Sequence, residues 1–148
     1  MFHIILFEPE IPPNTGNIIR LSVNTGFELH LIKPLGFSTD EKSLKRAGMD
    51  YMQKTDFKVW ESLNECLKNI NYKYVYGVST KGETNYTELK YKEGDAFLFG
   101  PESRGLPQKI RERFPSIFIP MKSEGRSLNL ANAVSIITYE AWRQLEFN

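Results

Sequence analysis

The chain has one cysteine, no long apolar run and almost no net charge. These three shortages argue against an internal disulfide, a membrane-spanning segment and binding to nucleic acid through overall charge. A single cysteine, Cys66, in 148 residues cannot form an internal disulfide and is compatible with a reducing compartment. No apolar run approaches the length needed to cross a membrane, and residues 1–7 lack the basic region of a signal peptide. We therefore expect a cytoplasmic protein that makes no contact with membranes.

The composition is that of a soluble globular protein, with 41% hydrophobic and 25% charged residues. The length suffices for one domain, spanning 1–148, with a core of its own. A formal net charge of +1 provides no overall attraction to nucleic acid. Any binding to nucleic acid must therefore depend on a local basic patch.

Two nucleotide-binding motifs are absent or incomplete. The glycine-rich dinucleotide fingerprint should follow the first strand, but residues 8–13 read EPEIPP, which argues against a nicotinamide-binding enzyme. Gly77 and Gly82 have the spacing of a phosphate-binding loop, yet Glu83 occupies the position where that loop needs lysine. A carboxylate at that position would repel phosphate.

Metal and hydrolase chemistry also find no support in the sequence. His3 and His30 have no partner at ligand spacing, so we expect no metal site. Ser79 and Ser103 have no nearby histidine that could act as a base.

Short apolar runs alternate with helical patterns along the chain. This alternation predicts an α/β fold with helices flanking a mostly parallel sheet. The segment 82–94 is polar and rich in tyrosine, and we interpret it as a long surface loop. The expected strands are 3–7, 28–32, 73–78, 96–99 and 117–119, and the expected helices are 14–24, 42–47, 59–69, 107–113 and 130–145.

Polar loops rich in glycine or proline follow four of these strands, at 8–17, 79–82, 100–105 and 120–129. Ligands in open parallel sheets bind beyond the carboxyl ends of the strands, so the four loops favour a functional face. Glu102, between two glycines and near arginine, suits a cationic or neutral ligand, and a sulfonium cofactor fits that description. A local turn with an exposed ion pair is the alternative reading of this loop.

The segment from Ile119 to Ser135 is the most informative part of the chain. A strand ends at Pro120, a polar loop with Gly125 follows, and a helix then opens near Ser127 and Asn129. Such a junction offers free backbone N–H groups and small polar side chains. On this segment alone, a binding site and an ordinary capped helix are both open interpretations.

Three ordered motifs make the chain resemble the SPOUT-class RNA methyltransferases. They are NTGNIIR at 14–20, FGPESRGL at 99–106, and IPM at 119–121 continued by SLNLANA at 127–133. The resemblance covers essentially the whole chain. It is closest to the short tRNA wobble-nucleotide ribose methyltransferases, which share EPEIPPN at 8–14 and YEAWRQ at 139–144.

The resemblance implies a deep C-terminal trefoil knot and methylation of the ribose 2′-hydroxyl of the wobble nucleotide, a cytidine or modified uridine, in the tRNA anticodon stem-loop. It also implies S-adenosylmethionine as cofactor, with its methionine part near Glu102, and no metal. The implied catalytic residues are Asn14, Arg20, Glu102, Ser127 and Asn129. The implied cofactor-binding residues are Val78, Thr80, Gly100, Glu102, Ile119, Met121, Ser127 and Leu128.

Arg20 is discussed in this family as activating the 2′-hydroxyl. Since arginine stays protonated in proteins, we favour a role in anchoring phosphate and orienting the ribose. The candidates for RNA contact are Arg20, Lys45, Arg46, Arg104, Lys122, Arg126, Tyr139 and Arg143.

The resemblance further implies a homodimer, in which the 14–20 segment completes the partner's site. Ile136, Ile137, Tyr139 and Trp142 on the last helix could form the interface, or they could simply pack in the core. Two other functions stay open: an RNA-binding module that has lost the chemistry, and a small-nucleotide binder suggested by fold class alone.

Overall fold

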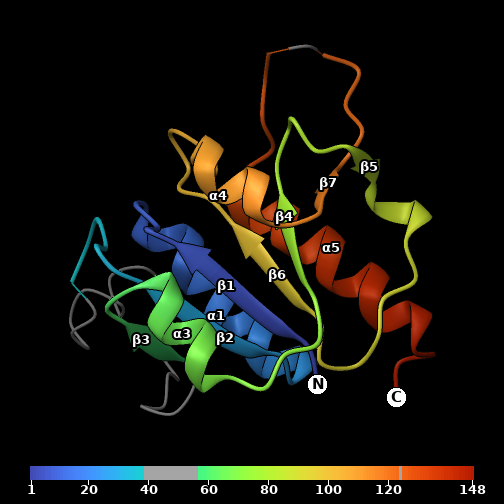
Figure 1. Ribbon diagram of the computed structural model, residues 1–148, viewed down its shortest axis with the longest axis horizontal. Helices are drawn as coiled ribbons and strands as arrows, with labels where there is room; N and C mark the ends of the chain where they lie inside the picture. The colour runs from blue at the N-terminus through green and yellow to red at the C-terminus, as the bar shows by residue number, and fades with distance from the viewer. Residues whose placement is uncertain (39–56, 124) are drawn as a thin grey trace.

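The computed structural model describes residues 1–38, 57–123 and 125–148. Its centre is an all-parallel sheet with the strand order β3-β2-β1-β6-β4-β7-β5 (Figure 1). The predicted α/β fold with a mostly parallel sheet is therefore confirmed. The strands are β1 (His3–Phe7), β2 (Glu28–Ile32), β3 (Lys58–Trp60), β4 (Val75–Val78), β5 (Thr84–Asn85), β6 (Ala96–Phe99) and β7 (Ser116–Phe118).

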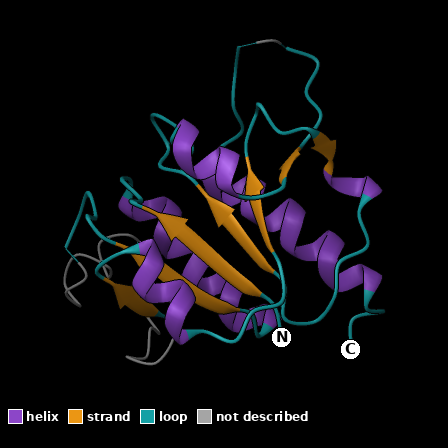
Figure 2. Ribbon diagram, in the orientation of Figure 1, coloured by secondary structure: helices purple, strands orange, loops and turns teal. Residues whose placement is uncertain are grey.

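Helices cover both faces of the sheet (Figure 2). On one face, α1 (Pro12–Thr25) and α5 (Leu130–Gln144) pack against the phenylalanines and aliphatic side chains of the central strands. On the other face lie α3 (Leu63–Asn69) and α4 (Gln108–Arg113). Because both faces are covered, all four residues of β6 are buried, as expected for a central strand of a parallel sheet. In the part of the chain described, no helix has the length and apolarity to span a membrane.

The predicted helix 59–69 is wrong in its first residues, which form strand β3 instead. Val59 and Trp60 pair with the edge of β2, and this pairing outweighs the helical spacing of the local sequence. The helix proper starts after Ser62, whose side chain accepts a hydrogen bond from the Glu65 backbone N–H. The predicted helix 42–47 lies outside the described residues.

The predicted long surface loop 82–94 is also wrong in part. It contains β5 and a single 3₁₀ turn, η1 (Tyr86–Glu88). Tyr91 is buried at 3% exposure against Tyr76 and Phe97. The edge of β7 provides hydrogen-bonding partners for β5, so a segment of polar composition is drawn into the sheet.

The connection between β4 and β5 crosses over β7, which lies between the two strands. The N–H of Ser79 donates to the Ile117 carbonyl over 3.0 Å, and the N–H of Glu83 donates to the Ser116 carbonyl over 3.2 Å. A Cβ atom on Gly82 would lie only 2.4 Å from the carbonyl carbon of Ile117. The crossing segment is thus held directly against the strand that passes beneath it.

Candidate active site at the carboxyl edge of the sheet

A hydrogen bond between two asparagines joins the starts of α1 and α5. Asn129 caps α5, its side-chain oxygen accepting from the Asn132 N–H over 3.2 Å. The Nδ2 of Asn129 donates to Oδ1 of Asn14 over 2.9 Å. Asn14 is 7% exposed and sits in the first turn of α1, which opens with two prolines suited to a helix start. The two helix starts are therefore fixed relative to each other.

Glu102 extends this chain of hydrogen bonds to the loop after β6. Its carboxylate accepts from Nδ2 of Asn14 over 3.3 Å and from the backbone N–H groups of Glu10 (2.9 Å) and Ile11 (2.6 Å). Asn14 thus donates to Glu102 while accepting from Asn129, an orientation that uses both ends of its amide. All three sequence motifs meet in this network, which runs from Glu102 through Asn14 to Asn129.

The loop after β6 also contacts the loop after β1 through other charged groups. Oε1 of Glu10 accepts from the backbone N–H of Ser103 (2.8 Å) and from its hydroxyl (2.7 Å). These two hydrogen bonds hold the pKa of Glu10 below its ordinary value. Arg104 lies 3.9 Å from the Glu8 carboxylate.

The expected cofactor-binding residues lie in the loops at this same edge. Val78 ends β4, Gly100 directly follows β6, and Ile119 follows β7. Two large apolar side chains of the last loop, Met121 and Leu128, are each 38% exposed. The loop in which they lie projects beyond the sheet (Figure 1). Thr80 and Ser127 are exposed in these two segments.

The structure places Arg20 on the exposed side of α1, six residues after Asn14, which is roughly 9 Å along the helix axis. Among the expected RNA-contacting residues, Arg104, Lys122 and Arg126 are exposed, as is Tyr139 at 45%. Arg143 makes two hydrogen bonds to Glu140, of 2.8 and 2.9 Å. Lys45 and Arg46 lie outside the described residues.

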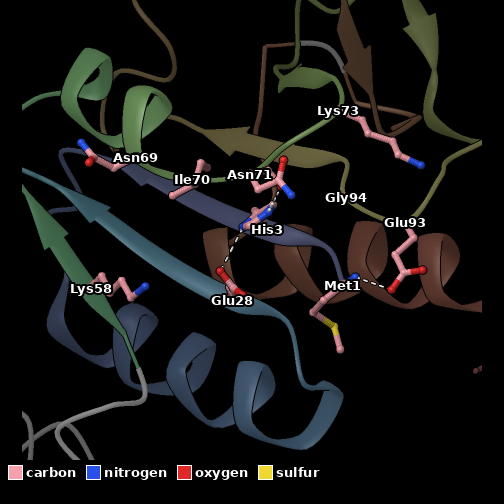
Figure 3. Close-up of a pocket in the computed structure, with 10 residues that line it drawn as sticks. All are labelled: Met1, His3, Glu28, Lys58, Asn69, Ile70, Asn71, Lys73, Glu93 and Gly94. Atoms are coloured by element: carbon pink, nitrogen blue, oxygen red, sulfur yellow. Dashed lines mark hydrogen bonds and ion pairs between the residues drawn. The ribbon is translucent and has the colours of Figure 1, made fainter.

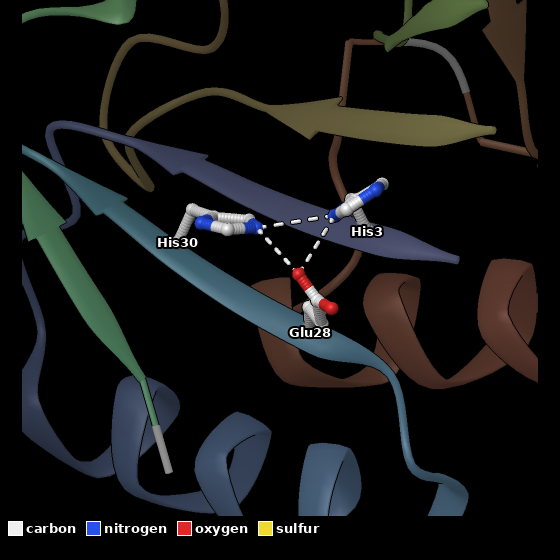
Figure 4. Close-up of side chains that lie close together, drawn as sticks. All are labelled: His3, Glu28 and His30. Atoms are coloured by element: carbon white, nitrogen blue, oxygen red, sulfur yellow. Dashed lines mark hydrogen bonds and ion pairs between the residues drawn. The ribbon is translucent and has the colours of Figure 1, made fainter. Parts of the chain in front are cut away.

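Sequence reasoning missed a polar cluster at the opposite edge of the sheet. His3, Glu28 and His30 present ligand-type atoms within 4.8 Å of one another (Figure 4). The expectation that the two histidines have no partner at ligand spacing is therefore wrong. The cluster depends on the register in which β1 pairs with β2, because this register sets His3 opposite Glu28, with His30 two residues further along the same strand face.

The hydrogen bonds of this cluster fix where its protons lie. An indole N–H can only donate, so Nδ1 of His30, 3.1 Å from Nε1 of Trp60, carries no proton. Neutral His30 therefore holds its proton on Nε2, which points at Nδ1 of His3 over 3.2 Å. Nε2 of His3 in turn donates to the Asn71 carbonyl over 3.1 Å. Burial lowers the pKa of His30 to about 3, so it is neutral at physiological pH.

A cavity of about 460 Å³ opens beside this cluster and is lined by His3, Glu28, Lys58, Lys73 and both Met1 and Glu93 (Figure 3). It lies where β1 and β2 begin. The functional loops follow the ends of the strands. We therefore locate the candidate site at the loops and not in this cavity, since ligands of open parallel sheets bind beyond the carboxyl ends of the strands.

In this parallel sheet one strand is crossed by the connection between its two neighbours, and the three motifs meet at the carboxyl edge. A family model described as the SpoU rRNA Methylase family matches residues 1–139, and the chain belongs to this family. The chain is 49% identical over 150 residues to the tRNA (cytidine(34)-2'-O)-methyltransferase of Methylovorus glucosotrophus, covering 99% of this chain and 97% of that one.

Two further relatives are similarly close over their full length. The protein of the same name from Escherichia coli K12 is 49% identical, covering 99% of this chain and 96% of its own. A solved structure described as giving insights into the 2-OH methylation of C/U34 on tRNA has a TM-score of 0.92 and 46% identity. It covers 100% of this chain and 98% of that one.

Proposed function

We propose that the protein transfers a methyl group from S-adenosylmethionine to the ribose 2′-hydroxyl of nucleotide 34, a cytidine or modified uridine, in the anticodon stem-loop of tRNA. Near-full-length relatives at about half identity carry this activity in their names. The observation that carries the proposal is the hydrogen-bonded chain from Glu102 through Asn14 to Asn129. It joins the three motifs at the edge of the sheet where a ligand of this fold belongs.

The residues at this edge fit the proposed cofactor. The side chains of Met121 and Leu128 are exposed and that of Ile119 is half-buried, so these residues offer apolar area to an adenine ring. Exposed backbone groups and small polar side chains of the same loops provide hydrogen-bonding partners for the ribose and the amino acid part of the cofactor. The full proposed set is Val78, Thr80, Gly100, Ile119, Met121, Ser127 and Leu128. When bound, the cofactor supplies an electrophilic methyl group on a sulfonium.

The chain's own residues then have to hold the attacking oxygen in line with that methyl group, and orientation alone can supply much of the rate. We assign the positioning of the ribose to Ser127 and Asn129 at the start of α5, with Asn14 beside them. Arg20 anchors phosphate and stabilises negative charge that develops on the oxygen. A protonated guanidinium performs both tasks. Glu102, with both oxygens engaged by its own chain, orients Asn14.

We propose that the chain forms a homodimer and that both copies bind the RNA. A net charge of +1 gives a single copy little overall attraction to RNA, and Arg104 and Arg126 are among the exposed cations of the described residues. Val23 of α1 is 51% exposed and Tyr139 of α5 45%, and these two helices pack side by side on one face. Ile137 is fully buried and so takes no part in an interface. Light scattering should give twice the 17.2 kDa mass of the chain, and a monomer at working concentration would contradict the dimer.

We also propose that the C-terminal part is knotted. The β4–β5 connection passes over β7 and is bonded to it by the N–H groups of Ser79 and Glu83, which supports threading of the later strand beneath the earlier loop. A cytoplasmic location follows from the proposed tRNA substrate, and the whole chain would act as one domain.

One experiment tests the activity against its alternatives. Purified protein is incubated with methyl-labelled S-adenosylmethionine and an unmodified tRNA transcript, and the labelled linkage is mapped by its resistance to alkali. A transcript with 2′-deoxyribose at position 34 is the matched control and should take up no label. Tight cofactor binding without transfer would favour an RNA-binding module that has lost the chemistry. Absence of cofactor binding would overturn the proposal.

A further inference from the structure

Two carboxylates bind the loops after β1 and β6 to each other in opposite directions. Glu102, on the β6 loop, accepts from the backbone N–H groups of Glu10 and Ile11. Glu10, on the β1 loop, accepts from the backbone N–H and the hydroxyl of Ser103. We call these four residues the carboxylate clamp. Each loop thus supplies one ionised acceptor and two donors to the other, and hydrogen bonds of this charge-assisted kind are the strong ones.

The segment that follows β2 also contacts the carboxylate clamp and restricts the backbone at Glu10. The N–H of Gly36 donates to the Pro9 carbonyl over 2.9 Å. A Cβ atom on Gly36 would lie 2.8 Å from both Cα and the carbonyl oxygen of Glu10. Glu8 has a φ of 50°, a left-handed conformation that a residue with a side chain adopts only where its surroundings impose it. The backbone at Glu10 is therefore set by contacts with two other strand exits.

Hydrogen bonds connect the carboxylate clamp to the residues that we assign to the reaction. The Glu102 carboxylate accepts hydrogen bonds from the backbone N–H groups of Glu10 and Ile11 and also from the Asn14 side chain. A shift of Glu102 would move Asn14, and with it the hydrogen bond to Asn129. The Glu10 side chain makes none of these bonds, although its backbone N–H donates to Glu102. It fixes the neighbouring residue, Ser103, and through it the position of the Glu102 carboxylate.

We propose that Glu10 is a positioning residue of this enzyme: its carboxylate holds Ser103 so that Glu102 keeps Asn14 and Asn129 in register for the ribose. The inference rests on the proposed function and extends it to a residue outside the three motifs. In this proposal the Glu10 carboxylate is engaged by Ser103 and contacts neither the substrate nor the cofactor. Its removal should therefore slow the chemical step without weakening cofactor binding.

The test compares four variants of the whole protein, which are two substitutions of Glu10, one of Ser103 and a double variant. Glu10→Ala removes both hydrogen bonds to Ser103, whereas Glu10→Gln keeps an acceptor oxygen of the same reach and loses only the charge. Small displacements from a productive geometry cost up to about 100-fold in rate. We expect kcat for the alanine variant to fall about 10- to 100-fold, with the Kd for S-adenosylmethionine within about twofold of the wild type. The glutamine variant should recover most of the rate.

Ser103→Ala provides a coupled control, since it removes the hydroxyl and leaves the backbone N–H in place. It should have a smaller effect than Glu10→Ala, and the double variant should be no slower than Glu10→Ala alone because both act through one contact. Glutamine as inactive as alanine, or independent additive losses in the double variant, would overturn the positioning role. So would a loss of activity matched by equal losses in cofactor affinity and melting temperature.

Amide hydrogen exchange separates this inference from the proposed function. Exchange at the Ser103 N–H should accelerate in Glu10→Ala and change little in Glu10→Gln, whether or not the protein methylates tRNA. Full activity in Glu10→Ala would refute the inference and leave the methyltransferase standing. A wild type without transfer activity, with slow Ser103 exchange, would refute the methyltransferase and with it the catalytic meaning of the clamp.

Discussion

The Nδ2 atom of Asn129 lies 2.9 Å from Oδ1 of Asn14, so one hydrogen bond joins residues 115 positions apart in the chain. The bond has a fixed direction, because Asn14 uses its own N–H₂ group to donate to Glu102. If the Asn14 amide turned over, its oxygen would face that carboxylate. The three side chains therefore form a polarised series in which only one arrangement satisfies every group.

Asn129→Asp should expose this polarity. Aspartate keeps an oxygen for the Asn132 N–H and so preserves the cap of α5, but it opposes oxygen to oxygen at Asn14. We expect transfer activity to fall at least about tenfold, with a melting temperature near that of the wild type. Asn129→Ala should lose both the activity and the cap, at a cost of about 1 kcal/mol in unfolding free energy. Equal stability losses in the two variants would contradict the assignment.

Arg20→Ala should abolish transfer while S-adenosylmethionine affinity stays nearly unchanged. The side chain lies on the exposed side of α1, and its proposed role is to bind the phosphate and the ribose oxygen, not the cofactor. Arg20→Lys keeps the charge and loses the planar fork, so it should retain a fraction of the activity. Weakened cofactor binding in Arg20→Ala, measured by calorimetry, would show that the residue is misplaced.

The sequence predicted the central strands well because burial on both faces leaves little room for error. Strands 3–7, 28–32 and 96–99 were predicted with the bounds they have. Strand 96–99 is apolar throughout, and only His3, Glu28 and His30 interrupt the apolar residues of the other two. The edge of the sheet was harder. Val59 and Trp60 fit a helical pattern, and only their pairing with β2 makes them a strand. Tertiary pairing of this kind leaves no local trace.

Part of the candidate site could be predicted from the sequence, because some of its features depend only on neighbouring residues. Helix caps and strand exits are local features, so Asn129 could be predicted at a helix start. The hydrogen bond to Asn14 spans most of the chain, and its existence depends on how the last segment passes through the fold. The partnership of His3 with Glu28 and His30 required the register of β1 against β2, which periodicity alone does not supply.

Acid should destabilise the protein through His30. Burial, together with the nearby charges of His3 and Lys58, lowers its pKa to about 3, from 6.5, although Glu28 lies 3.8 Å away. Because the unfolded chain binds the proton more readily, stability is complete above pH 6.5 and declines as the pH falls from there towards 3. At pH 5 the loss should be about 2 kcal/mol. Urea unfolding of His30→Gln, which cannot titrate, should show a loss between pH 7 and 5 that is smaller by about that amount.

Zinc should not stabilise the wild-type protein through this cluster. The Trp60 indole holds the His30 proton on Nε2, the atom that would have to face the ion, and a metal ligand must present a lone pair. Trp60→Phe removes the indole donor and frees His30 to carry its proton on Nδ1. We expect micromolar zinc to raise the melting temperature of Trp60→Phe and not that of the wild type. Stabilisation of both would show that the indole does not control the site.

Alanine substitution of two glycines should distinguish the cost in stability of steric crowding from the cost of a left-handed backbone. Gly82 has no room for a side chain, because a Cβ atom would lie 2.4 Å from the Ile117 carbonyl carbon, a backbone atom of the strand that the segment crosses. Gly125 has a φ of 75°, but a Cβ atom added there would meet nothing within 4 Å. Gly125→Ala should therefore cost only the left-handed conformation, about 1 kcal/mol. Gly82→Ala must push the β4–β5 connection off β7 and should cost at least about 3 kcal/mol, if the chain folds at all. Denaturant unfolding measures both costs, and a Gly82→Ala variant as stable as Gly125→Ala would mean that the crossing segment is not held tightly against β7.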